Sequence, residues 1–162
     1  MALPAPGFVA HQATVVGVSA AQCQRLVAAL EGERKAAGAV ADVDFRLPLT
    51  SVELSALLGA KSFARLLALF GGRADEIVVR RMAAAGRCIP FHTDSSLRVM
   101  QVPLNDDSTY GGGRLVFVAP GGRLVAPPRP AGSATIHDNQ IVHGVTTMTH
   151  GVRYGLYFLQ TC

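Results

Sequence analysis

The sequence changes character at Glu76, and the pattern beyond this residue restricts the fold more than any other feature. From there on, short runs rich in β-branched and aromatic residues alternate with segments rich in Gly, Pro, Asn and Asp. The runs are EIVVRRM, LRVMQVPL, RLVFVAP, GRLVAP, SATIHD, QIVHGVTTM and VRYGLYFLQ. Many short strands in succession, preceded by helices, predict an α+β protein with a β-sandwich or barrel-like core.

The residues before Glu76 are predicted to be mainly helical. The VVGV segment at 15–18 is predicted to be a strand, and Ser19 with Gln22 has the pattern of a helix capping box. Apolar residues follow at helical spacing, and a second helical region is predicted over 51–72. We expect one domain over 1–162, with a helical N-terminal part of about 1–75 and a β core of about 76–162.

Composition excludes several classes of protein. The formal charge is +4, but the basic residues are scattered, so we expect no nucleic-acid partner. The longest apolar runs are too short to cross a bilayer, and the N-terminus lacks the pattern of a secretory signal, so we expect no membrane partner. The three widely spaced cysteines predict neither a disulfide framework nor a CxxC site. An intracellular, cytoplasmic location is the expectation that follows.

His92 and Asp94 stand two residues apart in an extended stretch. Residues i and i+2 of a strand point to the same face, so both side chains can reach one point. Two His and one carboxylate form the common arrangement around non-haem Fe(II). The third ligand should therefore be a His on another strand. The candidates are His11, His137, His143 and His150.

His143 is the strongest candidate because Arg153 follows it ten residues later, in the last predicted strand. A 2-oxo acid could occupy two of the metal positions left free, and its far carboxylate would then need a partner. Arg offers a planar, permanently charged fork for such a carboxylate. His137 stands next to Asp138, and adjacent strand positions point to opposite faces. A structural or ligand-supporting role is therefore predicted for His137.

In these residues the chain resembles the Fe(II)/2-oxoglutarate-dependent dioxygenases, in particular the prolyl 4-hydroxylase-like branch. The resemblance runs from about Ile77 to Gln160. It rests on the order His92-Thr93-Asp94, YGGGRLVF, AGSATIHD, His143 and Arg153. The fold that it implies is a double-stranded β-helix (jelly roll), with the N-terminal helices packed on one sheet.

The resemblance also implies an activity. His92, Asp94 and His143 would be the metal ligands and the catalytic residues, with Fe(II) as the metal. Arg153 would bind the far carboxylate of the cosubstrate 2-oxoglutarate. With O₂, such an enzyme converts 2-oxoglutarate to succinate and CO₂ and hydroxylates an unactivated C–H, with ascorbate as a possible reductant. The expected partner is a protein, a peptide or a small amino-acid-like substrate, with a peptidyl side chain such as proline preferred.

One position departs from the family pattern. Relatives in this branch often carry a Tyr about ten residues before the first His, where it helps to hold the cosubstrate carboxylate, and this chain has Met82 there. Gln101, on the following strand, is predicted to point into the same pocket and to replace the missing donor.

The dioxygenase hypothesis has two alternatives. The first is a non-catalytic sensor that binds 2-oxoglutarate or metal on the same fold, and Met82 favours it. The second is a cupin-type metal protein, which would require an HxH pair and a Glu that this chain lacks. Neither the substrate nor the oligomeric state follows from the sequence.

Overall fold

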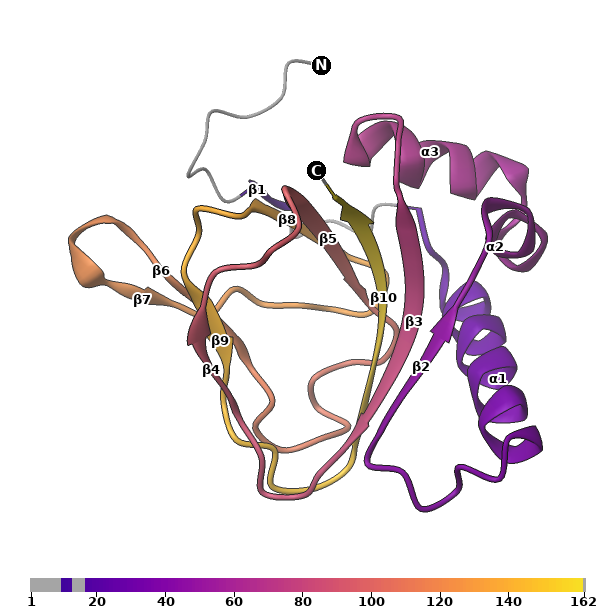
Figure 1. The fold of residues 1–162 in the computed structure, drawn as a ribbon, viewed down its shortest axis with the longest axis horizontal. Coiled ribbons are helices and arrows are strands. Elements are labelled where there is room, and N and C mark those ends of the chain that lie inside the picture. Colours follow the sequence, from indigo (N-terminus) through magenta and orange to yellow (C-terminus); the bar gives the residue numbers. More distant parts are fainter. Residues whose placement is uncertain (1–9, 13–16, 162) are drawn as a thin grey trace.

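The computed structural model describes residues 10–12 and 17–161. Its three α-helices lie in the first half of the chain, and most of its strands lie in the second half (Figure 1). The helices are α1 (Ala20–Ala36), α2 (Ser51–Leu58), α3 (Ala60–Phe70) and the 3₁₀ turn η1 (Pro120–Gly122). The strands are β1 (Ala10–Gln12), β2 (Asp44–Pro48), β3 (Glu76–Ala83), β4 (Ile89–His92), β5 (Arg98–Pro103), β6 (Leu115–Val118), β7 (Leu124–Val125), β8 (Ala134–Asp138), β9 (His143–Val145) and β10 (Val152–Gln160).

The first two helices begin at capping boxes. The Ser19 hydroxyl accepts a hydrogen bond from the Gln22 amide, and the Gln22 side chain accepts one from the Ser19 amide. Thr50 and Glu53 make the same reciprocal pair at the start of α2. Each box satisfies backbone donors that would otherwise lack partners at a helix start, and this explains why the helices begin where they do.

The second helical region consists of two helices and not one. Gly59 separates α2 from α3 and has a φ of 83°, which side-chain-bearing residues rarely adopt. The chain turns at this residue and α3 runs on in a new direction (Figure 1). Of the strand predicted at 15–18, residues 15 and 16 lie outside the described residues, and Gly17 and Val18 are not part of a strand.

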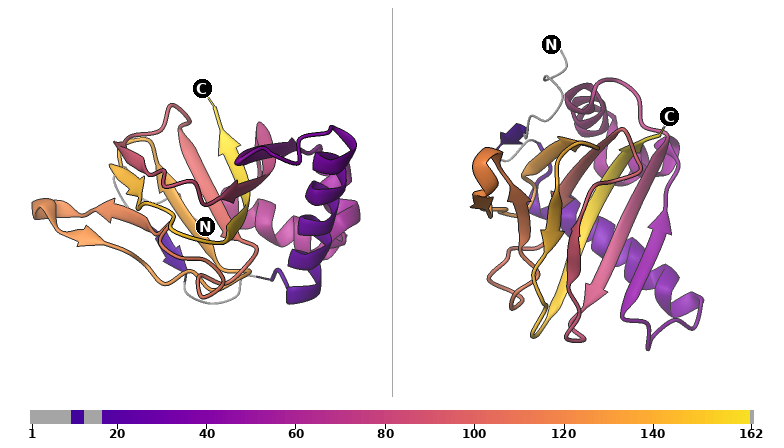
Figure 2. Two further views of the ribbon diagram at one scale, coloured as in Figure 1. Left: turned by 90° about the horizontal axis from the view of Figure 1, so that it is seen from below. Right: turned by 60° about the vertical axis from the view of Figure 1, so that its left-hand side comes forward.

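The strands form two antiparallel sheets that face each other, as in a jelly roll (Figures 1 and 2). The larger sheet has the order β1-β8-β5-β10-β3-β2, and the smaller has the order β4-β9-β6-β7. The predicted α+β class with a jelly-roll core is therefore confirmed. The mainly helical part before Glu76 also contains β2, which pairs with β3 and extends the larger sheet.

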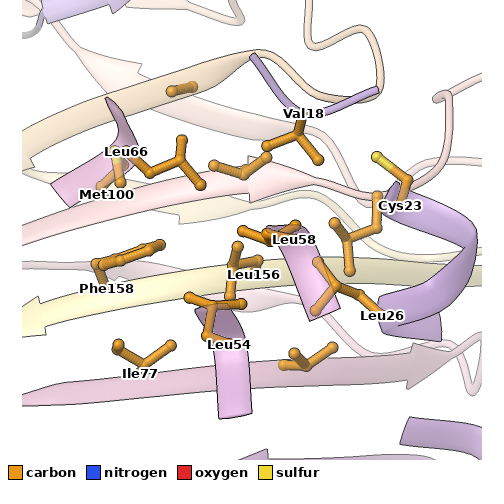
Figure 3. Packing of buried hydrophobic residues seen from close by; sticks show 14 of the residues in the cluster. Val18, Cys23, Leu26, Leu54, Leu58, Leu66, Ile77, Met100, Leu156 and Phe158 are labelled. Atoms are coloured by element: carbon orange, nitrogen blue, oxygen red, sulfur yellow. The ribbon is translucent and has the colours of Figure 1, made fainter. Parts of the chain in front are cut away.

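The helices share one hydrophobic core with the larger sheet. Figure 3 shows Leu26 of α1 and Leu54 of α2 beside Leu156 of β10, and all three side chains are fully buried. Burying a leucine stabilises the fold by about 1.5–3 kcal/mol, so this layer supplies much of the hydrophobic stabilisation. In the part of the chain that the structure describes, no helix has both the length and the apolar character needed to cross a membrane.

Strand β10 divides its side chains between two environments, as the pleat of a strand requires. Leu156 and Phe158 belong to the core shared with the helices. Arg153, Tyr157 and Leu159 point to the other face and line a cavity between the sheets. The helices therefore cover one face of the larger sheet and leave the other face free for a site.

Candidate metal centre and cosubstrate pocket

The three predicted metal ligands come together between two strands of the smaller sheet. His92 is the last residue of β4, and it lies opposite His143, the first residue of β9. Asp94 follows two residues after the end of β4, in the segment that leads to β5. The register of β4 on β9 therefore brings together residues that are 51 positions apart in the sequence.

The ligand atoms of these residues are close enough for one ion to contact all three. One atom from each of His92, Asp94 and His143 lies within 4.8 Å of the others. His92 Nε2 is 3.4 Å from Asp94 Oδ1, and His143 Nε2 is 3.6 Å from Asp94 Oδ2. Two imidazole nitrogens and one carboxylate, with space on one side, suit a divalent transition metal.

Backbone carbonyls orient both histidine rings. His92 Nδ1 lies 2.8 Å from the Pro90 carbonyl oxygen, and His143 Nδ1 lies 3.1 Å from the Ile141 carbonyl oxygen. A carbonyl oxygen can only accept, so each Nδ1 carries the proton and each Nε2 keeps a free lone pair. Both Nε2 atoms face Asp94, which is the tautomer and orientation that a metal ligand requires.

His137 is a third ring in this cluster. Its Nε2 donates to Asp94 Oδ2 over 2.9 Å, and its side chain is fully buried. The ring lies 4.4 Å from that of His143, centroid to centroid. The structure thus places His137 against a predicted ligand, in agreement with the supporting role expected for it. His150, by contrast, is exposed.

The protonation states at the centre suit metal binding. Burial alone would raise the pKa of Asp94, but the hydrogen bond from His137 and the nearby imidazoles lower it below its ordinary value. Burial, together with the neighbouring His137, lowers the pKa of His143. At neutral pH Asp94 is therefore ionised and His143 is neutral, and ligands must be deprotonated in this way to bind a metal.

One cavity connects this cluster to the larger sheet. It is lined by His92, Asp94 and His143 on one side, and by Gln101 and Arg153 on the other. Arg153 is only 5 % exposed, and in the described part of the chain no carboxylate pairs with it. A buried guanidinium that faces a cavity without a partner is suited to bind an anion there.

Met82 and Gln101 occupy the positions that the sequence suggested. Met82 pairs directly with Arg153 across β3 and β10, so no hydroxyl comes from that position. Gln101 is buried on β5, opposite Tyr157, and lines the same cavity. Its role as a replacement donor stays a prediction.

Tyr157 is a cavity residue that the motif did not predict. A Cβ at Gly155 would lie 2.8 Å from Tyr157 Cε2 and 3.1 Å from its hydroxyl oxygen, so the ring lies over Gly155 and extends toward Arg153. Burial raises the pKa of the Tyr157 phenol, but the guanidinium groups of Arg153, Arg129 and Arg80 outweigh this and lower it. A strand places residues i and i+4 on one face, so the spacing from Arg153 could have revealed Tyr157.

Comparisons with known proteins give structural matches only. A scan with protein-family models finds no match, and a search of curated proteins finds none either. A prolyl-4-hydroxylase from Pseudomonas putida matches with a TM-score of 0.65 at 16% identity, covering 95% of this chain and 92% of that one. HygX from Streptomyces hygroscopicus, solved with nickel and 2-oxoglutarate, matches with a TM-score of 0.66 at 15% identity, covering 93% and 80%.

A prolyl hydroxylase from Trichoplax adhaerens, in complex with a peptide fragment of hypoxia inducible factor, matches with a TM-score of 0.64. Its identity is 10%, and the match covers 94% of this chain and 81% of that one. These similarities show that the chain has the fold of the 2-oxoglutarate-Fe(II) oxygenases. Two of these matches are prolyl hydroxylases, in line with the resemblance noted in the sequence.

Proposed function

We propose that the protein is an Fe(II)- and 2-oxoglutarate-dependent oxygenase that hydroxylates an unactivated C–H bond. The observation that carries this proposal is one cavity that holds both a possible metal triad and a buried, unpaired Arg153. A simple metal-binding protein would need the triad but not a guanidinium facing the same space. The fold supports the proposal, because the similar solved structures include 2-oxoglutarate-Fe(II) oxygenases.

His92, Asp94 and His143 would hold the iron. When bound, Fe(II) supplies the oxygen chemistry that no protein side chain can perform. The protein's own contribution is geometric. The two carbonyl hydrogen bonds fix the imidazole rings, and the hydrogen bond from His137 fixes the carboxylate of Asp94.

Arg153 would bind the far carboxylate of 2-oxoglutarate. Its guanidinium is buried at the larger sheet, whereas the triad lies on the smaller sheet across the cavity. A ligand with a chelating group at one end and a carboxylate at the other would span this space. Gln101 and Tyr157 line the same side of the cavity and could donate further hydrogen bonds.

A peptidyl side chain such as proline is the preferred substrate. Its support is the Trichoplax adhaerens prolyl hydroxylase, which was solved with a peptide bound. The test is incubation of the protein with Fe(II), 2-oxoglutarate, O₂ and ascorbate. Mass spectrometry of proline-containing peptides and free amino acids should then detect the gain of one oxygen atom, with succinate formed in parallel. His143→Ala is the matched control and should give neither product.

The Arg153 variants separate an enzyme from a plain metal binder. Arg153→Ala should keep the metal but weaken 2-oxoglutarate binding by about 2–5 kcal/mol, the usual cost of truncating one member of a buried charge pair. Arg153→Lys should also be impaired, since an ammonium cannot make a bidentate contact. Unchanged 2-oxoglutarate turnover in Arg153→Ala would remove the basis of the proposal.

The sensor alternative rests on Met82, which leaves the position opposite Arg153 without a donor. It would be supported if the wild-type protein bound metal and 2-oxoglutarate but formed no succinate with any substrate offered.

A further inference from the structure

Arg129 is a second buried arginine close to Arg153. It lies in the segment between β7 and β8 and is only 6 % exposed, although Pro residues flank it on both sides. Long-range hydrogen bonds hold this segment in place. The Gly132 amide donates to the Pro103 carbonyl over 2.8 Å, and Pro103 pairs with Gly155, two residues from Arg153 on β10.

The two guanidinium groups repel each other. Burial lowers the pKa of Arg129 to about 10, and the charge of Arg153 contributes to this shift. Arg129 remains charged at neutral pH, yet its Nε has no hydrogen-bond partner. Within residues 10–12 and 17–161 neither arginine forms a salt bridge. Two buried like charges without a counterion destabilise the protein that contains them.

Polar groups on β8 and just before it also lack hydrogen-bond partners. The side chain of Thr135 is fully buried, and its Oγ1 has no hydrogen-bond partner. In the sheet, Thr135 lies opposite Gln101 of β5, and Gln101 lies opposite Tyr157 of β10. Directly opposite residues in antiparallel strands share a face, so all three side chains point between the sheets. Ser133 lies two residues before Thr135, is equally buried and also leaves its Oγ unpaired. Unpaired buried polar groups are rare in native proteins, and a ligand bound near these groups would supply partners for them.

The geometry points to a two-arginine carboxylate site, in which Arg153 contacts the ligand and Arg129 adds a second charge behind it. This inference rests on the proposed function and extends it. Arg153 lines the cavity and Arg129 does not, so the two roles differ. A carboxylate offers about four lone-pair positions, which is enough for a bidentate guanidinium and a further donor such as the Tyr157 hydroxyl.

The second charge makes the site selective. A 2-oxo acid with a far carboxylate relieves the repulsion between the two arginines, whereas one that ends in a methyl group leaves both charges buried and uncompensated. Arg129 is therefore a specificity-determining residue that favours dicarboxylic over monocarboxylic 2-oxo acids. It also destabilises the ligand-free protein, which is the opposite of what a purely structural arginine would do.

The experiment compares wild type, Arg129→Met and Arg129→Lys, each loaded with Mn(II) under anaerobic conditions. Arg123→Met is the matched control, since Arg123 is an exposed arginine six residues earlier in the same part of the chain. Calorimetry gives the dissociation constants of 2-oxoglutarate and of 2-oxopentanoate, which lacks the far carboxylate. Thermal unfolding is measured with and without each compound.

Arg129→Met should raise the dissociation constant of 2-oxoglutarate on the order of 30-fold and leave that of 2-oxopentanoate nearly unchanged. Its Tm without ligand should equal or exceed that of wild type, while the Tm increase caused by 2-oxoglutarate should shrink. Arg129→Lys keeps the charge and should retain most of the preference for 2-oxoglutarate. Arg123→Met should behave as wild type.

Three results would overturn the inference, and a fourth concerns the proposed function. Wild-type affinity for 2-oxoglutarate in Arg129→Met would show that the second charge is not used. An equal loss of affinity for both compounds, or a variant that is less stable or unfolded without ligand, would show that Arg129 is structural. If wild type binds neither compound, the proposed function itself fails, and the inference that rests on it fails too.

Discussion

His137 offers a direct test of how the metal centre is held together. Its ring is fully buried and donates one hydrogen bond, from Nε2 to Asp94 Oδ2. The other ring nitrogen, Nδ1, is buried without a partner. Replacement by Phe keeps a ring of similar size, removes the donor to Asp94 and eliminates the unsatisfied nitrogen.

The expected magnitude follows from this single bond. A hydrogen bond to a charged group contributes about 1.5–3 kcal/mol. Loss of a group that orients a metal ligand typically lowers metal affinity about 10–100-fold, equivalent to about 1.4–2.8 kcal/mol. The two ranges agree, so we expect His137→Phe to bind Mn(II) about 10–100-fold more weakly than wild type. The fold should be nearly as stable as before, because a buried unsatisfied atom is lost together with the bond.

Anaerobic calorimetric titration with Mn(II) measures the affinity, and urea unfolding of the metal-free protein measures the stability. His137→Gln is the informative companion, because its amide NH₂ can occupy the place of Nε2 and should restore most of the affinity. His150→Phe, at an exposed histidine, is the matched control. Wild-type Mn(II) affinity in His137→Phe would refute the argument that this hydrogen bond orients Asp94.

The remaining predictions concern the pocket and the helix layer. Gln101→Leu should weaken 2-oxoglutarate binding, and Met82→Tyr should strengthen it or leave it unchanged, as measured by anaerobic calorimetry; unaltered affinity in Gln101→Leu would remove Gln101 from the site. Leu26→Ala, at a fully buried position, should lower the free energy of unfolding by about 2–5 kcal/mol in urea titrations. Burial raises the pKa of Glu31, but hydrogen bonds from Tyr154 and Arg34 lower it overall. Wild type should therefore have a larger free energy of unfolding than Glu31→Gln at neutral pH, and this difference should disappear as the pH falls through the lowered pKa of Glu31. Urea unfolding at several pH values measures the difference. The same pH dependence in both proteins would contradict the prediction.

Much of the candidate site could be predicted because its residues lie in a fixed order on strands. His92 and Asp94 are two residues apart, which is a local pattern, and the ten-residue distance from His143 to Arg153 follows from the short connection between β9 and β10, which lie in opposite sheets. The structure brings these residues to one cavity. The strands of the second half could be predicted equally well, because turn-forming residues separate them.

The features that the sequence did not reveal depend on contacts between distant segments. Strand β2 stands alone between helices and is defined by its pairing with β3, which the local sequence does not show. Arg129 lies in a proline-rich segment without periodicity, and a hydrogen bond between distant residues, from Gly132 to Pro103, holds this segment in place. Within the helical region predicted over 51–72, the break at Gly59 depends on its backbone conformation, a φ of 83°.

The alternation of side chains along β10 determines which substitutions can alter ligand binding without disturbing the hydrophobic core. Leu156 and Phe158 face the helices, whereas Arg153 and Tyr157 face the cavity, although all four belong to one strand. A library that randomises β10 position by position should therefore separate into two populations. Variants at the helix-facing positions should lose abundance in cells, and variants at the cavity-facing positions should remain abundant while their preference among ligands shifts. New ligand specificities are thus accessible along this strand by single substitutions that leave the hydrophobic core untouched.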